Sequence, residues 1–322
     1  MRKLLPCLSY CLPLLLLSVA SGASAQDLVY DDGGDHVLSE YGTLRNGSIV
    51  EVRDGPGVDP THLDVTIDDF TYEVDFRVYD GSSAALQPSI GGATLDTFGN
   101  AVGTIASSSR AENDANSWGS SQLTASSRLF NSTANEDSTF TFLQGSNAVL
   151  HRGYGSSTTI MLGGGTYDTQ LFDSAVMRVY AGFPGQEGTF VTDDAYLEIL
   201  GGNPLSYNGF AVDGRGRADI HSGATWDAGE WMSVEEQGVV QLFGQNFLLD
   251  GVPVGFGDIT ALPGGATRSG NIQGTLESGD LIDMEFYVSG AGILRLVPEP
   301  GTGLLMALGL LASGVFRRVR AA

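Results

Sequence analysis

The sequence predicts an all-β protein whose body is a parallel β-solenoid with coils of about 20 residues. Between Gln26 and Val297 no long stretch keeps apolar residues at helical spacing, whereas short segments alternate apolar and polar residues and end in glycine, serine or asparagine. These segments recur at separations of 20, 17, 20, 21 and 22 residues. A regular period of this length is typical of a solenoid.

Each repeat carries two apolar residues with one residue between them. The first residues of these pairs, predicted to point inward, are Phe140, Ile160, Met177, Leu197, Ala218 and Val240. The second inward residues are Phe142, Leu162, Val179, Ile199, Ile220 and Leu242. The residues between them, mostly polar and predicted to point outward, are Thr141, Met161, Arg178, Glu198, Asp219 and Gln241. The glycines expected at the corner that follows are Gly145, Gly164, Gly182, Gly201, Gly223 and Gly244.

In a solenoid each strand lies about 4.8 Å from the strand of the preceding coil, so inward residues stack into an apolar column. Arg178 and Glu198 would then be outward neighbours on adjacent coils. Glycine is expected at the corners because a positive φ costs it little. The alternative fold is an antiparallel β-sandwich or jelly roll, whose strands also recur at short intervals. The segment from Ala84 to Trp118 fits the period poorly, which leaves its path open.

The N-terminus has the composition of a secretory signal peptide. A basic start, Arg2 and Lys3, precedes an apolar stretch that closes on Ala23-Ser24-Ala25, the small-x-small pattern read by signal peptidase. We therefore expect cleavage between Ala25 and Gln26, with residues 1–25 forming a signal helix. An uncleaved membrane helix is the alternative, but the apolar core is short and Pro13 interrupts it. Cleavage would remove both cysteines, which leaves no disulfide in the mature chain.

The C-terminus has three parts in a fixed order. Pro298-Glu299-Pro300 comes first, an uncharged stretch from Thr302 to Phe316 follows, and Arg317, Arg318 and Arg320 end the chain. This tripartite end resembles the PEP-CTERM sorting signal of exported bacterial proteins. The resemblance implies that an exosortase recognises Pro298, Glu299 and Pro300, and that the tail is processed at the cell surface. The apolar stretch is predicted to form a transmembrane helix, with the arginines as its cytoplasmic stop. An ordinary anchor helix is the alternative.

Further segments resemble PEP-CTERM proteins built as repetitive parallel β-helices. In that group a DGPG segment opens the stack, and an F-x-x-DG-x-P segment with a GTL-x-x-G segment closes it. The corresponding residues here are Asp54–Gly57, Phe247–Pro253 and Gly274–Gly279. On this basis we predict a signal peptide over 1–25, a solenoid body over 26–246, a C-terminal β cap over 247–296 and the sorting signal over 297–322. A cap is expected because an open solenoid end exposes unpaired strand edges.

The charge of the chain excludes one class of partner. The chain has 16 basic and 38 acidic residues, a formal net charge of -22. Five of the basic residues and one acid lie outside Gln26–Val297, so the body carries 11 arginines, no lysine and 37 acids. Such a surface repels phosphate backbones, which excludes nucleic acid as a partner.

Catalytic motifs are nearly absent from the sequence. His36, His62, His151 and His221 are scattered and predicted to lie on the surface. Adjacent acids occur at Asp31-Asp32, Asp68-Asp69, Asp193-Asp194 and Glu235-Glu236, but neighbours on a strand point to opposite faces. A lyase would also need a basic group, and only Arg215 and Arg217 are clustered. The sequence therefore predicts no catalytic residue, no cofactor and no metal site, with Ca²⁺ at an Asp-rich turn as the alternative.

Two functions remain open at this point. The first is a noncatalytic cell-surface or extracellular-matrix protein of structural or adhesion type, which associates with extracellular polysaccharide and meets signal peptidase and an exosortase during export. The second is a secreted β-helix lyase or glycosidase acting on polysaccharide. Trp118, Trp226 and Trp231 could stack on sugar rings in either case, although core or corner packing is the expectation for them. The sequence favours the noncatalytic protein, in contact with the membrane only through its terminal segments.

Overall fold

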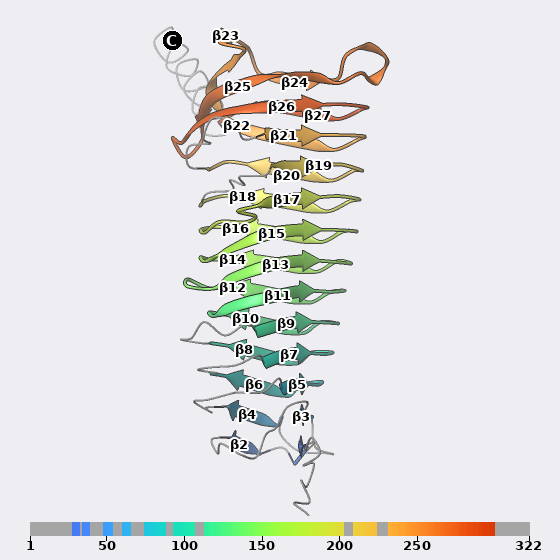
Figure 1. Ribbon diagram of the computed structural model, residues 1–322, viewed down its shortest axis with the longest axis vertical. Coiled ribbons are helices and arrows are strands. Elements are labelled where there is room, and N and C mark those ends of the chain that lie inside the picture. Colours follow the sequence, from blue (N-terminus) through green and yellow to red (C-terminus); the bar gives the residue numbers. More distant parts are fainter. Residues whose placement is uncertain are drawn as a thin grey trace, which may run out of the picture.

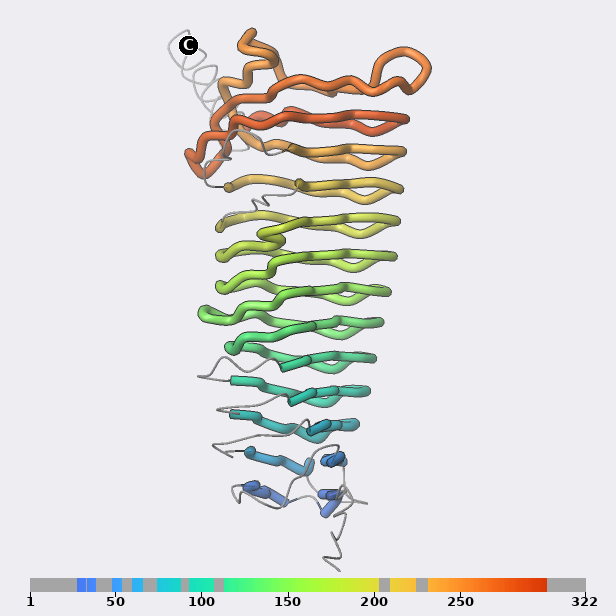
Figure 2. The backbone as a smooth tube through the Cα atoms, in the orientation of Figure 1, coloured from blue at the N-terminus to red at the C-terminus, as the bar shows by residue number. Residues whose placement is uncertain are grey.

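The protein is a long column of stacked β-coils (Figure 1). The computed structural model describes residues 28–299 apart from 33, 39–47, 54–59, 66–73, 88–92, 107–112, 203–208 and 224–230. The coils rise evenly from the N-terminal to the C-terminal end (Figure 2). The predicted signal helix and C-terminal hydrophobic helix lie outside the described residues. Within those residues the only helix is one short 3-10 turn, and none is long and apolar enough to cross a membrane.

Two parallel ladders of strands run along the column. The first consists of β1 (Leu28–Tyr30), β3 (Ser48–Val52), β5 (Val74–Val78), β7 (Ala93–Thr97), β9 (Asn113–Ser117), β11 (Arg128–Ala134), β13 (Asn147–Gly153), β15 (Gly165–Leu171), β17 (Gly188–Val191), β19 (Phe210–Val212), β21 (Trp231–Val234) and β26 (Leu281–Val288). The second consists of β2 (Asp35–Leu38), β4 (His62–Val65), β6 (Ser83–Leu86), β8 (Val102–Ile105), β10 (Gln122–Ala125), β12 (Thr139–Phe142), β14 (Thr158–Met161), β16 (Val176–Val179), β18 (Tyr196–Ile199), β20 (Arg217–Ile220), β22 (Val239–Leu249) and β27 (Ile293–Pro298). Each coil contributes one strand to each ladder, and the parallel pairing excludes an antiparallel sandwich for the body.

The register of the second ladder confirms most of the predicted columns. Met177 pairs with Leu197, and Leu197 pairs with Ala218, all of them buried. Arg178 lies outward beside Glu198, as predicted, with 3.0 Å between Arg178 Nε and Glu198 Oε2. In β18 the side chains alternate between the core and the outer surface, as a pleated strand requires. In β20 and β22 Asp219 and Gln241, which were predicted to point outward, are buried as well.

One strand of the predicted columns is out of register by one residue. In β14, Thr159 and Met161 are buried and Ile160 is half-buried, and Leu162, the residue after the strand, is 48 % exposed. The assignment of Ile160 and Leu162 as inward and of Met161 as outward is therefore wrong. Thr159 occupies the inward position because its hydroxyl has a buried hydrogen-bond partner, His151.

Where the structure describes it, the segment from Ala84 to Trp118 follows the same path as the rest of the column. Strands β6 to β9 continue both ladders in parallel register. Its periodicity is weak because inward positions hold small residues, such as Ala93 and Ala115. Gly103 is required by packing, since a Cβ there would lie 2.6 Å from the Thr97 methyl group. Apolar periodicity therefore misses coils whose core is narrow.

The C-terminal end of the column changes from parallel to antiparallel pairing. Between β22 and β26 the chain forms β23 (Val252–Pro253), β24 (Gly257–Thr260), the turn η1 (Pro263–Gly265) and β25 (Arg268–Leu276). Strand β25 pairs antiparallel with both β22 and β26 and so joins the two ladders, while β24 pairs antiparallel with β27. These strands cover the end of the stack, which would otherwise present open strand edges.

Glycine lies at the corner after the second-ladder strands β12, β14, β16, β18 and β20, as expected. Gly244 lies inside strand β22, so its assignment to a corner is wrong. Gly145, Gly164 and Gly182 have φ values of 90°, 76° and 109°. One coil later the positive φ, 88°, belongs to Gly202 rather than to Gly201. Gly201 is needed for another reason: a Cβ there would lie 2.2 Å from the Tyr180 carbonyl oxygen.

Candidate functional site

The sorting motif begins where the last strand of the solenoid ends. Pro298 is the final residue of β27, which pairs in parallel with β22 up to Gly244. The next residue, Glu299, is the last that the structure describes. The other predicted processing residues lie outside the described part of the chain: Ala23, Ala25, Gln26, Pro300, Arg317, Arg318 and Arg320. The solenoid therefore delivers its C-terminus directly to the motif, without an intervening domain.

The adjacent acids form no common metal or catalytic cluster where the structure describes them. Glu235, Glu236 and Asp193 lie near the Asp213 carboxyl, whose pKa is raised by burial and further by these three charges. Asp193 contacts a backbone N–H of the preceding coil, whereas Asp194 forms an ion pair with Arg215. At the N-terminal end Asp32 accepts hydrogen bonds from the Gly34 N–H and from His36, which lower the pKa of its carboxyl. The pair Asp68-Asp69 lies outside the described residues. No group of three or more histidine, cysteine or acidic side chains in the described chain could hold a metal ion.

The acids of one corner have a structural role that the sequence did not indicate. At the turn between the first and second strand of a coil, Glu136, Asp173 and Asp193 adopt φ values of 55°, 55° and 57°. Their carboxylates accept hydrogen bonds from the turn N–H of the coil before. Asp173 Oδ2 lies 3.0 Å from the Gly155 nitrogen, and Asp193 Oδ2 lies 3.2 Å from the Asp173 nitrogen. These acids link successive coils.

The two clustered arginines are both engaged with carboxylates. Arg215 makes two contacts with Asp194, and Arg217 makes two with Asp219. Asp219 also accepts a hydrogen bond from the Tyr196 hydroxyl at 2.9 Å. Burial raises the pKa of Tyr196, and this hydrogen bond raises it further. Arg215 therefore joins two adjacent coils, whereas Arg217 pairs within its own strand, β20, whose Asp219 is bonded in turn to Tyr196 of the preceding coil.

One histidine lies in the core, which corrects the prediction of a surface residue. His151, on β13, is fully buried between the two ladders. Its Nδ1 lies 2.9 Å from the Ser132 hydroxyl and its Nε2 lies 2.8 Å from the Thr159 hydroxyl. The ring also contacts Phe140 and Phe142. Burial lowers its pKa to about 3, so the imidazole is neutral in the folded protein.

The other histidines are half-buried at the outer surface. His36 and His62 contact Asp32 and Asp64. His221 stacks on Phe243, with ring centroids 4.0 Å apart, and contacts Glu277 in the C-terminal part of the chain. Each of these histidines contacts a carboxylate, and none of these contacts involves a second histidine.

The tryptophans that the structure describes pack at the surface of the column. Trp118 stacks on Phe98, and Phe98 stacks on Tyr79, with ring centroids 4.9 and 5.0 Å apart. Trp231 covers Gly209, where a Cβ would lie 2.4 Å from the indole ring. Trp118 therefore shows the corner packing that was expected. Trp226 lies outside the described residues.

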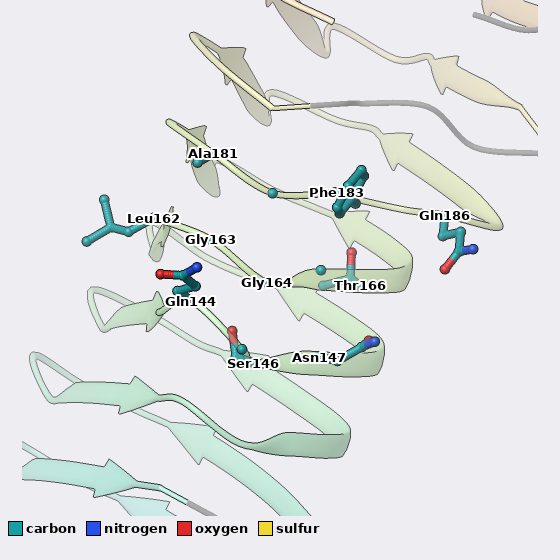
Figure 3. A pocket seen from close by; sticks show the side chains of 13 residues that line it. Gln144, Ser146, Asn147, Leu162, Gly163, Gly164, Thr166, Ala181, Phe183 and Gln186 are labelled. Carbon is teal, nitrogen blue, oxygen red and sulfur yellow. The ribbon is translucent and has the colours of Figure 1, made fainter. Parts of the chain in front are cut away.

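A hollow of about 650 Å³ opens at the corner between the second-ladder and first-ladder strands. It crosses three successive coils, from Gln144 and Asn147 on the lowest to Phe183 on the highest (Figure 3). Gly163 and Gly164 of the middle coil line its floor. Gly164 is expected from the sequence only as a corner glycine. The residue that marks the hollow is the aromatic residue one coil later, Phe183, which is 53 % exposed.

Comparison with known proteins identifies the end of the chain. Residues 296–320 match the PEP-CTERM protein-sorting motif, which includes Pro298-Glu299-Pro300 and the terminal arginines. No curated protein and no solved structure matches the chain. The motif implies export, sorting to the cell surface and processing by an exosortase. The chain is thus a parallel β-solenoid that ends in a PEP-CTERM protein-sorting motif.

Proposed function

We propose that this protein is a noncatalytic component of the cell surface or extracellular matrix, of structural or adhesion type, which signal peptidase and an exosortase process during export. The observation that carries the proposal is the position of the sorting motif at the end of β27. A folded column that ends directly in the motif would remain close to the membrane until the tail is processed. The mature protein would then be released or attached as one rigid body.

The charges of the surface support a structural role. The ion pair Arg178–Glu198 joins one pair of adjacent coils, and the pair Asp194–Arg215 joins another. At the turn between the two strands of a coil, Asp173 and Asp193 add hydrogen bonds to the preceding coil. These polar groups serve the stacking of the coils. Assignment as a noncatalytic protein rests on this use of the acids and arginines, which an enzyme would direct toward a substrate.

Substitution of the central residue of the sorting motif tests the proposal. We expect the Glu299→Ala variant to accumulate in the native host as a longer, membrane-associated precursor, because the exosortase would no longer recognise the segment. Glu187→Ala, which removes an exposed carboxylate from the body, is the matched control and should be processed normally. Fractionation followed by immunoblotting measures both. Unchanged mass and location of the Glu299 variant would reject sorting through this segment.

A further inference from the structure

We infer that the hollow beneath Phe183 binds a neutral glycan chain. This inference rests on the proposed surface role and names the ligand class that the role would involve. The hollow combines an exposed aromatic ring, amide side chains and a floor of glycine backbone. Each of these features suits a sugar, which presents C–H faces and hydroxyl groups on the same ring.

The backbone of Phe183 is held in place although its ring is exposed to solvent. Its backbone N–H donates to the Gly164 carbonyl at 3.0 Å, and its own carbonyl accepts from the Thr166 N–H at 2.8 Å. The corner is fixed again two residues later, where the Gly185 N–H donates to the buried Thr166 hydroxyl at 2.7 Å. An exposed ring on a fixed backbone is a preorganised platform, since little freedom is lost when a ligand binds to it.

The floor of the hollow must remain free of side chains. A Cβ at Gly163 would lie 2.8 Å from the Gln144 Cα, and a Cβ at Gly182 would lie 2.5 Å from the Gly164 carbonyl oxygen. Because these glycines are required for the coils to stack, the backbone lies open beside Phe183 (Figure 3). Across three coils the hollow is about 10 Å long, enough for a short stretch of a linear chain.

The lining of the hollow is uncharged, although the protein is strongly acidic. None of the 13 residues that line it carries a charge. Gln144 and Asn147 supply amide groups that both donate and accept hydrogen bonds, as vicinal sugar hydroxyls do. The face of the Phe183 ring carries partial negative charge and attracts the polarised C–H groups of a sugar. An anionic chain would find no cation in the lining and would be repelled by the surrounding acids, which favours a neutral glycan.

Binding of defined oligosaccharides to the purified full-length chain tests the inference. The probes are cellohexaose and maltohexaose as neutral chains and hexagalacturonate as an anionic chain, measured by saturation-transfer NMR and calorimetry. We expect at least one neutral chain to bind and hexagalacturonate not to bind. Phe183→Ala should weaken the neutral complex at least about tenfold, which corresponds to ~1.4 kcal/mol. Phe190→Ala is the matched control, because this phenylalanine is 41 % exposed and lies outside the hollow.

A second pair of variants covers the case in which Phe183→Ala does not fold. Gln144→Ala removes an exposed amide from the hollow and should weaken binding, whereas Gln237→Ala removes an exposed amide from another corner and should not. No binding of either neutral chain, preference for hexagalacturonate, or equal effects within each pair would overturn the inference. If no neutral chain binds but the Glu299→Ala variant stays in the membrane as a precursor, the glycan site alone is rejected. If a neutral chain binds but the Glu299→Ala variant is processed normally, the sorting proposal alone is rejected.

Discussion

Arg178 and Glu198 lie side by side on adjacent coils, with 3.0 Å between Arg178 Nε and Glu198 Oε2. Their strands, β16 and β18, pair in parallel, so that Met177 and Leu197 occupy the inward positions just before them. This relationship fixes the register of the column at its centre. It also places two adjacent residues on opposite faces of the strand: Leu197 is fully buried, whereas the Glu198 side chain is 24 % exposed.

Substitution of these two neighbours tests the register. Leu197→Asp places a carboxylate between the Met177 and Ala218 side chains, and burial of an unpaired charge should destabilise the fold by more than ~3 kcal/mol. Glu198→Gln retains the shape and removes only a surface ion pair, which costs less than ~1 kcal/mol. Thermal melts of both variants measure the difference. Equal losses, or a larger loss at Glu198, would show that the strand faces are assigned wrongly.

The buried imidazole predicts how stability depends on pH. His151 has a folded pKa of about 3 and an ordinary value of 6.5, so the unfolded chain binds one more proton between these values. Stability from this group is complete above pH 6.5 and falls as the pH decreases toward 3, by ~1.4 kcal/mol per pH unit. Chemical denaturation at pH 7 and pH 5 should show about 2 kcal/mol more loss in the wild type than in His151→Gln. An identical loss in both proteins would mean that His151 is not buried and neutral.

Two adjacent glutamates should respond in opposite directions to glycine. Glu236 has a φ of 52°, a conformation that glycine adopts at lower cost, whereas Glu235 does not have a positive φ. Burial raises the pKa of the nearby Asp213 carboxyl, and both glutamates raise it further, so either substitution relieves some repulsion. Glu236→Gly should stabilise the protein by about 0.5–1 kcal/mol, because the relief of left-handed backbone strain, ~1–2 kcal/mol, exceeds the backbone entropy that glycine costs. Glu235→Gly should destabilise it by a similar amount through backbone entropy. Differential scanning calorimetry gives the sign, and a loss for both variants would contradict the turn geometry.

The sequence predicts the fold well where inward residues are large and apolar. Leu197 and Val240 belong to a column whose spacing is visible from the residues alone. The prediction is wrong at β14 because Ile160 and Leu162 are more apolar than the buried Thr159. The threonine is satisfied by His151 from the other ladder, and a contact between two ladders leaves no periodic signal. Coils whose inward positions hold small or polar residues, such as Ala115, Asn113 and Ser117 of β9, escape detection for a related reason, since their inward residues do not contrast with the outward ones.

The candidate site was predictable in one part only. The sorting motif depends on residues that are contiguous in sequence, so Pro298, Glu299 and Pro300 could be named directly. The hollow is assembled from three coils, and its aromatic residue, Phe183, lies 39 positions after Gln144. Only the coil-on-coil stacking brings these residues together. The hydrogen bond between Asp193 and the Asp173 N–H depends on the same stacking.

Intact-mass analysis of the protein recovered from the surface fraction of the native host tests the central claim most directly, because one spectrum reports both ends of the chain. We predict a mature chain that begins at Gln26 and has lost the arginines 317, 318 and 320, which would demonstrate signal-peptide cleavage and processing at the sorting motif together. A mass equal to that of the unprocessed 322-residue chain would contradict the account. So would a mature chain that begins at Gln26 but still ends at Ala322, because the motif would then act only as an anchor.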